Sequence, residues 1–522
     1  METPDAGREP AATELLRLLA DPGGARLCLV TGGPGRGKST LLGRLAGHPA
    51  HAFVPLEGQS ALGAAWSLAE RLGVVVRDPG ELVQVLTTES RQVVIVLPDL
   101  HAAQEPDALA ELIERLSELG NLRLVVEART GTPAHRRLAA RRPAVLDLDQ
   151  EQWRWRGRGP ARYGARRRER PAVDLDDPAA VCAADPLRVT AAYAAEGGEG
   201  HGGLRAAWLR AGQSLCRDQT PSRRALVLLS TLGDGADPRL RPALEQLAAP
   251  EPWRVRWTRV RGDVTPPWPG PVAALAVGTG PLRGRLLVAD RVGTVRLIHA
   301  ADAAPAGRPA HAPGGRVTAL APLPDGTVLL LDERGRLHSV RGVPRTAASR
   351  PGGAGERLTE AVAATLTTHP GTALAAVGGT VVVGDRVGSV HAFSLGGVRQ
   401  AAPHSGRVTA VAAVEAPEPV VYSGGADGTV RSWAPAQGPP AAPLAERPYP
   451  VVALHAAVTA EGPTLAVAWR DGLVGAHRQE AGRRLEFHPG QPVRAVAVTP
   501  DGDLVIGMDE SLVCLRASGG PR

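Results

Sequence analysis

The first third of the chain alternates short apolar runs with amphipathic segments. Residues 26–31 and 93–97 are largely apolar and have the length of strands buried on both faces of a parallel sheet. Residues 106–119 instead repeat leucine and isoleucine at helical spacing along one face. Further strands are predicted at 122–126 and 145–148, and a further helix at 61–72. This order predicts an α/β domain over residues 8–150, with a doubly wound sheet that binds its ligand at the carboxyl ends of the strands.

The second half of the chain repeats one pattern of strands. A first strand rich in valine and alanine recurs six times, and a second strand runs into an aspartate in each unit. The first strands begin at Val272, Val317, Thr372, Val408, Val451 and Val493, and the aspartates are Asp290, Asp332, Asp385, Asp427, Asp471 and Asp509. The mean spacing of the first strands is about 44 residues, the period of a four-stranded propeller blade. Residues 251–522 therefore predict an all-β propeller of about six blades, whose units resemble WD repeats.

The repeats also predict how the ring closes. The last unit ends at residues 512–516 without a fourth strand, whereas residues 253–260 form a strand that precedes the first unit. We expect these two segments to pair, because closure removes open sheet edges. Histidines stand before several first strands, and these are His311, His369, His404 and His488. As in WD repeats, we expect them to bond the turn aspartate of their own blade, for example His404 with Asp427, rather than to bind a metal.

Two segments lie between the halves. Residues 171–250 carry helical patterns at 204–216, 223–232 and 238–247, and we predict a helical, lid-like domain there. Residues 151–170 form a linker with eight arginines, Arg154 to Arg170. Between Trp153 and Arg170 these arginines stand against Glu169 alone, which gives +7, the net charge of the whole chain. Aromatic residues interleave these arginines, which leaves open a surface for single-stranded nucleic acid. A solvated linker is the preferred interpretation, because no nucleic-acid fold accompanies the cluster.

A glycine-rich loop follows the first predicted strand. Gly32, four further residues, Gly37, Lys38 and Ser39 form the Walker A pattern, which functions between a strand and a helix. Lys38 is the only lysine among 60 basic residues, and a compact ammonium suits a backbone cradle better than a planar guanidinium does. The glycines allow backbone N–H groups to turn inward around phosphate. The predicted cofactor-binding residues of this loop are Gly32, Gly33, Pro34, Gly35, Arg36, Gly37, Lys38, Ser39 and Thr40.

The strand at 93–97 ends in a departure from the usual Walker B pattern. Pro98 occupies the first acidic position and Asp99 the second. We expect Ser39 and Asp99 to hold Mg²⁺, with Asp99 also the candidate catalytic carboxylate, although one carboxylate cannot fill both acidic roles. Nucleotide binding should survive this change, and any ATP hydrolysis should be slow.

These segments resemble the signal-transduction ATPases with numerous domains, a branch of the AAA-type P-loop NTPases. The resemblance covers about residues 10–250 and rests on the loop, on Leu97-Pro98-Asp99-Leu100-His101, and on residues 124–129. It implies ATP with Mg²⁺ as ligand and a contact between Arg129 and the γ-phosphate. It also implies that Pro186 packs against adenine and that the helical segment forms a lid over the nucleotide.

The prediction is therefore a multidomain, ATP-binding signalling or scaffold protein, in which the nucleotide state controls a helical lid and a propeller that binds protein partners. Two alternatives stay open: a static propeller module with a hydrolytically degenerate ATP site, and a nucleic-acid-associated ATPase that uses Arg154 to Arg170. Four dispersed cysteines, the lack of a secretory signal pattern and the lack of a long apolar run favour a cytoplasmic protein without membrane contact. Oligomerisation is possible.

Overall fold

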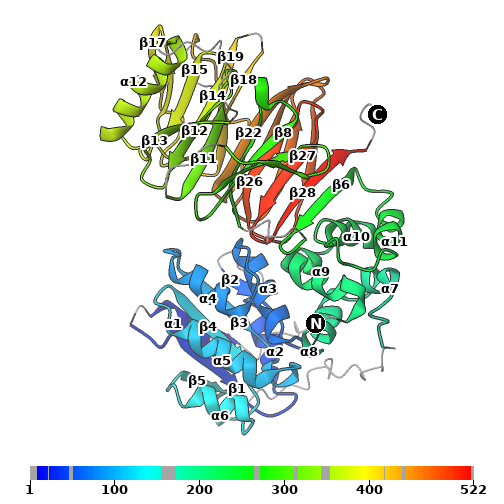
Figure 1. Cartoon of the computed structure of the whole chain (residues 1–522). Coiled ribbons are helices and arrows are strands. Elements are labelled where there is room, and N and C mark those ends of the chain that lie inside the picture. The colour runs from blue at the N-terminus through cyan, green and yellow to red at the C-terminus, as the bar shows by residue number, and fades with distance from the viewer. Residues whose placement is uncertain are drawn as a thin grey trace. The chain divides into compact units, whose positions relative to one another are not determined.

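The computed structural model describes residues 9–21, 23–45, 51–153, 172–196, 198, 200–263, 271–309, 315–342, 353–416, 418–437 and 442–518 (Figure 1). The chain divides into two compact units. The first comprises Met1–His201 with Leu215–Asp218, and the second comprises Gly202–Ser214 with Gln219–Arg522. No helix in the described ranges combines the length and the hydropathy that a bilayer crossing requires.

The first unit is built on a five-stranded parallel sheet with the strand order β2-β3-β4-β1-β5. Its strands are β1 (Leu27–Thr31), β2 (His51–Phe53), β3 (Val93–Leu97), β4 (Leu122–Glu127) and β5 (Ala144–Asp147). Its helices are α1 (Glu9–Ala20), α2 (Lys38–Gly43), α3 (Ala61–Leu72), α4 (Pro79–Thr87), α5 (Pro106–Ser117), α6 (Pro133–Ala139), α7 (Pro178–Ala183) and α8 (Pro186–Ala195). The predicted α/β architecture with a parallel sheet is confirmed.

The core of this unit lies around β1. All five residues of β1 are buried, so both faces of the sheet are covered at its centre. Cys28 and Val30 share a cluster with Leu15 of α1 and with Leu41 and Leu42 of α2. This packing fixes the turn from β1 into α2, and that turn carries the glycine-rich loop.

The second unit contains six antiparallel sheets, which confirms the predicted six-bladed propeller. Blades one to three consist of β7 (Val272–Val277), β8 (Arg285–Asp290), β9 (Val295–His299) and β10 (Pro305–Gly307); β11 (Val317–Pro322), β12 (Thr327–Asp332) and β13 (Leu337–Arg341); and β14 (Ala373–Val377), β15 (Thr380–Gly384), β16 (Val390–Ser394) and β17 (Gly397–Ala401). Blades four and five consist of β18 (Val408–Glu415), β19 (Pro419–Gly425), β20 (Thr429–Trp433) and β21 (Ala445–Glu446); and β22 (Val451–Thr459), β23 (Gly462–Trp469), β24 (Val474–Arg478) and β25 (Arg483–Phe487).

The sixth blade joins the two ends of the propeller sequence. It consists of β26 (Val493–Val498), β27 (Leu504–Met508), β28 (Ser511–Ala517) and, as its outer strand, β6 (Trp253–Val260). Strand β6 runs antiparallel to β28, with Val260 opposite Ser511 and Trp253 opposite Ala517. The predicted closure of the ring is therefore confirmed, and β6 covers an edge that β28 would otherwise expose.

The second blade departs from the repeat. Its sheet has three strands in the described residues, and the chain then forms α12 (Ala354–Thr368) before the third blade begins. Leu358, Val362 and Leu366 recur every four residues and pack into the core between the second and third blades. Sequence analysis did not predict this helix, although the 55-residue gap from Val317 to Thr372 is longer than the mean spacing of the first strands.

The helical segment at 171–250 contributes to both units. Helices α7 and α8 belong to the first unit, whereas α9 (Leu204–Ala211), α10 (Pro221–Leu229) and α11 (Leu240–Leu247) belong to the second. Ser214 Oγ donates to the carbonyl oxygen of His488 at 2.6 Å, and Thr258 Oγ1 donates to that of Leu229 at 3.1 Å. These bonds join α10 and the segment that follows α9 to the propeller.

Candidate functional site: the loop at 32–40 and the propeller channel

The loop after β1 has the backbone that its glycines allow. Gly35 and Gly37 both have φ 74°, in the left-handed region that disfavours other residues, and Gly37 directly precedes α2. Lys38 folds back over this loop, where Nζ donates to the carbonyl oxygens of Gly32 at 2.9 Å and Gly33 at 3.1 Å. The lysine is 7% exposed, so its ammonium lies inside the loop rather than in solvent.

The rim of the loop is tied to the segment after β5. Asp149 accepts a hydrogen bond from the backbone N–H of Gly33 at 2.8 Å and pairs with the guanidinium of Arg36 at 2.7 Å. Arg36, predicted to bind the cofactor, is thus engaged by a carboxylate. Sequence analysis did not identify Asp149, and its position just past the fifth strand was the one available signal.

Three polar side chains meet beside Lys38: Ser39 in the first turn of α2, Asp99 just after β3 and Glu127 at the end of β4. Ser39 Oγ lies 3.0 Å from Glu127 Oε2 and 3.5 Å from Asp99 Oδ1, and Lys38 Nζ lies 3.8 Å from Glu127 Oε1. Glu127 is only 2% exposed. Burial, followed by the charge of Asp99, raises the pKa of the Glu127 carboxyl above its ordinary value, against the opposing effect of Ser39 and Lys38.

His101 completes a cluster with the two carboxylates. One ligand atom from each of Asp99, His101 and Glu127 lies within 4.8 Å of the others. Burial is the largest cause of a lowered His101 pKa, and the nearby cations Lys38 and Arg129 lower it further. Two carboxylates beside a hydroxyl offer the oxygen ligands that Mg²⁺ prefers, so these residues fit a magnesium–phosphate ligand.

The remaining predicted residues lie at different distances from this cluster. Pro34, Gly35 and Thr40 are exposed on the loop, and Arg129 is exposed just after β4, close enough to affect the pKa of His101. Pro186 opens α8, where its neighbour Leu187 packs against Gly63 of α3. Pro186 stands apart from the hydrogen bonds that join Lys38, Ser39, Asp99 and Glu127. The Arg154 to Arg170 cluster lies outside the described residues.

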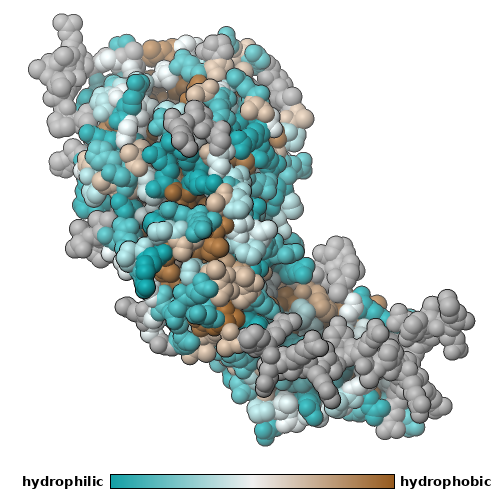
Figure 2. Space-filling view, turned by 90° about the vertical axis from the view of Figure 1, so that its right-hand side faces the viewer, coloured by the Kyte–Doolittle hydropathy of each residue, from teal (hydrophilic) through white to brown (hydrophobic). Residues whose placement is uncertain are grey.

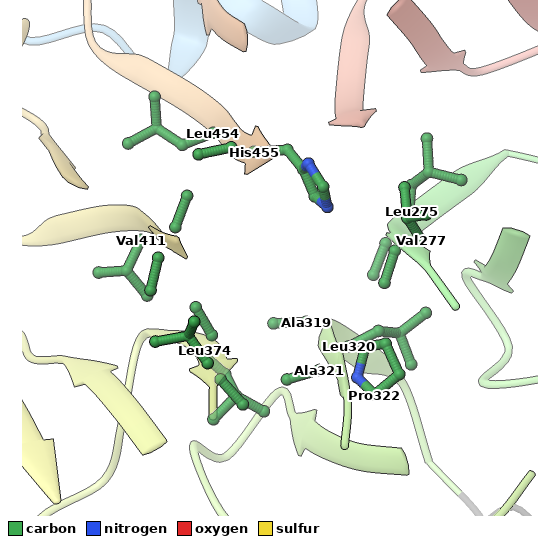
Figure 3. Close-up of a pocket in the computed structure, with 18 of the residues that line it drawn as sticks. Leu275, Val277, Ala319, Leu320, Ala321, Pro322, Leu374, Val411, Leu454 and His455 are labelled. Carbon is green, nitrogen blue, oxygen red and sulfur yellow. The ribbon is translucent and has the colours of Figure 1, made fainter. Parts of the chain in front are cut away.

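The propeller encloses a central channel of about 440 Å³, lined by the first strand of every blade (Figure 3). Most of its lining is aliphatic, and among the labelled side chains the His455 ring is directed toward the opening. His455 Nδ1 accepts a hydrogen bond from the backbone N–H of Val498 at 3.1 Å, so Nε2 carries the proton of the neutral ring. The channel therefore presents an imidazole donor among mainly aliphatic side chains, and Arg283, Glu415 and Arg494 also belong to its lining.

The tight turns of the blades are built on the repeated aspartates. The predicted bond is present in the fourth blade, where His404 Nδ1 lies 3.1 Å from Asp427 Oδ1. Two other blades use a histidine of the third strand instead: His338 lies 2.9 Å from Asp332, and His391 lies 3.0 Å from Asp385. His311 lies outside the described residues. His338, His391 and His404 are thus structural members of their blades.

The outer surface carries separate apolar positions. In the face that Figure 2 shows, apolar residues form scattered patches between hydrophilic ones. Val292 and Val387 are 79% and 78% exposed, and they occupy the same place in two equivalent turns, Asp-Arg-Val-Gly, of the first and third blades. Single exposed apolar side chains of this kind are ordinary on protein surfaces and do not by themselves mark a binding site.

Comparison with known proteins supports the propeller. Residues 398–434 match the family described as "WD domain, G-beta repeat". One similar solved structure is the WD40 beta propeller domain of Doa1, with 12% identity over 51% of this chain and 98% of that chain and a TM-score of 0.36. Another is the computationally designed Ika8 protein, with 21% identity over 47% of this chain and 71% of that chain and a TM-score of 0.30. No curated protein matches the chain. The WD repeat indicates a protein-interaction module.

Proposed function

We propose that the first unit binds ATP with Mg²⁺ and that the bound nucleotide controls how the propeller binds a protein partner. The observation that carries this proposal is the meeting of Lys38 and Ser39 with Asp99 and Glu127 at the carboxyl ends of β1, β3 and β4. In a parallel sheet these ends share one edge, which is the edge where ligands bind.

The loop has the parts that a triphosphate requires. The positive φ angles of Gly35 and Gly37 allow a turn whose N–H groups can face an anion. Lys38 is held by neutral carbonyl oxygens, and a phosphate oxygen would be a stronger, charged acceptor for the same ammonium. Arg129 supplies a second cation beyond the cluster. Because Asp99 and Glu127 lie in the same cluster, a polyanion would bind together with Mg²⁺, whose charge offsets these carboxylates.

Ser39 and the carboxylates would hold the magnesium ion, which neutralises phosphate charge when it is bound. Pro98 leaves β3 with one acidic residue instead of two, so we expect slow hydrolysis. Slow turnover suits a timed switch, in which the bound state persists until hydrolysis resets it.

The connection between the units gives the proposed control a route. The polypeptide passes from one unit to the other at residues 201–202, 214–215 and 218–219. Helices α7 and α8 precede the first crossing, α9 lies between the first and the second, and α10 and α11 follow the third. The bonds of Ser214 to His488 and of Thr258 to Leu229 join this helical segment to the propeller. A change in the first unit that follows nucleotide binding therefore acts on three covalent links to the partner-binding unit.

The test is amide hydrogen exchange with and without ATP and Mg²⁺. The proposal expects slower exchange in residues 32–40 and a second change in residues 202–260, and Lys38→Ala should abolish both. Arg17→Ala, which removes a cation whose exposed side chain pairs with Glu14, is the matched control and should keep both. Protection at 32–40 without any change in the second unit would support the static interaction module instead.

A further inference from the structure

The neighbour of β3 carries the acidic residue that β3 lacks. Strand β4 lies between β3 and β1, and in the parallel register Leu97 stands opposite Val126 while Val30 stands opposite Glu127. One further step along the first register aligns Pro98 with Glu127. The carboxylate therefore lies at the level of the missing acid, displaced sideways by one strand toward the glycine-rich loop.

Glu127 also has the contacts of a metal-site residue. The Ser39 hydroxyl donates to its Oε2 at 3.0 Å, which is closer than the 3.5 Å to Asp99. Its Oε1 lies 3.8 Å from the Lys38 ammonium. The hydroxyl of Ser39, which directly follows the lysine, is thus closer to Glu127 than to Asp99.

The surroundings of Glu127 favour a cation. A buried carboxylate is unfavourable unless it is paired, and Glu127 is 2% exposed with a second carboxylate, Asp99, in the same cluster. Asp99 itself adopts φ 61°, an uncommon backbone conformation for a residue other than glycine. The chain thus maintains two carboxylates side by side next to a single ammonium, an arrangement that a divalent ion would relieve.

We propose that Glu127 is the metal-ordering carboxylate of this site, in place of the acid that Pro98 has removed from β3. Mg²⁺ is then held beside Ser39 and Glu127, and Asp99 remains as the second carboxylate of the site. This inference rests on the proposed binding of ATP with Mg²⁺. It places the metal-ordering carboxylate on β4, whereas the Walker B pattern places it at the end of β3.

The test is calorimetric titration of the full chain with ATP, in Mg²⁺ and in EDTA. In the wild type, Mg²⁺ should tighten ATP binding. Glu127→Gln keeps the size of the side chain and removes its charge. The gain from Mg²⁺, which is the factor by which Mg²⁺ tightens ATP binding, should therefore fall by about tenfold or more, while the affinity for ATP in EDTA is kept or improved. Glu114→Gln is the matched control, because Glu114 is also buried but pairs with Arg137 and Arg141, and it should keep the full gain.

A double variant tests directly whether Glu127 acts in place of the acid that is missing from the end of β3. Pro98→Asp with Glu127→Gln restores an acid at the end of β3 and should recover most of the gain from Mg²⁺. If Glu127→Gln does not fold, as judged by circular dichroism, Glu127→Asp is used instead. This variant keeps the charge on a side chain that is shorter by one methylene, and it should reduce the gain from Mg²⁺ in part.

The outcomes separate the two proposals. Suppose that the wild type binds ATP and that Glu127→Gln keeps the full gain from Mg²⁺. The assignment of Glu127 is then wrong, whereas ATP binding stands. If Glu127→Gln does not fold, the same conclusion follows when Glu127→Asp keeps the full gain. If Glu127→Gln tightens ATP equally in Mg²⁺ and EDTA, Glu127 is only a partner of Lys38 and the assignment is again wrong. If the folded wild type binds no ATP in either condition, the proposed function itself fails.

Discussion

The imidazole of His404 lies between the carboxylate of Asp427, 3.1 Å from Nδ1, and the hydroxyl of Ser423, 2.9 Å from Nε2. The His404 side chain is completely buried. Three parts of the fourth blade are thereby joined: the segment before its first strand, its second strand and the turn that follows. This relationship indicates that His404 stabilises the blade rather than binds a ligand.

Replacing His404 by leucine should therefore destabilise the propeller. The change keeps an apolar volume but leaves Asp427 and Ser423 without their buried partner, which costs about 1–3 kcal/mol. The measurement is the free energy of unfolding of the propeller in urea, followed by circular dichroism. His338→Leu is the matched control, because His338 is 35% exposed beside Asp332 and its loss should cost less. Equal losses in the two variants would contradict this account.

Gly490 tests the packing of the helices against the propeller. It has φ 89°, and a Cβ at this position would collide with the carbonyl oxygen of Ala211 at the end of α9. Gly490→Ala should therefore lower the free energy of unfolding by about 3 kcal/mol, from backbone strain and overpacking together. Gly482→Ala, at φ 58° with open space around it, should cost about 1 kcal/mol from strain alone. A smaller cost at Gly490 than at Gly482 would show that α9 does not pack there.

The propeller should lose stability in mild acid. Burial lowers the pKa of His455 from 6.5 to about 4, and burial together with the charge of Arg484 lowers that of His477 to about 4 as well. Between these values the unfolded chain binds protons that the folded chain does not. The stabilisation is thus complete above pH 6.5 and is lost as the pH falls toward 4, by up to about 1.4 kcal/mol per pH unit for each histidine.

The pH dependence is measured by urea unfolding at several pH values. The double variant His455→Gln with His477→Gln should have a flatter profile between pH 6.5 and 4 than the wild type. In the first unit, His201 should act in the opposite sense, because its hydrogen bond to Glu196 raises its pKa and its contribution is lost as the pH rises. An unchanged profile in the double variant would assign the acid sensitivity to other groups.

Removing β6 should open the ring. A fragment of residues 202–522 keeps Trp253 and Trp257, which are 1% and 6% exposed, and should unfold cooperatively. A fragment of residues 261–522 lacks both and leaves β28 as a free edge, so it should aggregate or fail to unfold cooperatively. Size-exclusion chromatography and thermal unfolding distinguish the two results. Identical behaviour of the fragments would show that closure through β6 is dispensable.

The features that could be predicted are those encoded by residues close together in the sequence. The apolar runs, the glycine-rich loop and the 44-residue spacing identified the parallel sheet, the strand-loop-helix unit and the six blades, because each is encoded by neighbours in sequence. The closure by residues 253–260 was also predictable, since a strand without a blade and a blade without a strand complement each other.

The position of Glu127 beside Ser39 and Asp99 was not predictable in the same way. It depends on β4 lying between β3 and β1, which is a property of the sheet order and not of the chain order. His391 likewise takes the place beside Asp385 from the third strand, where the repeat predicted a histidine before the first. Such contacts are decided by which strands become neighbours, and one sequence does not state this.

The proposed switch requires that the first unit bind ATP with Mg²⁺ through Lys38. Isothermal titration calorimetry of the folded full chain with ATP and Mg²⁺ measures this binding, with Lys38→Ala and Arg17→Ala titrated in parallel. We expect saturable binding by the wild type and by Arg17→Ala, and loss of binding by Lys38→Ala. Absence of heat in the wild type across temperatures, or equal binding by Lys38→Ala, would contradict it.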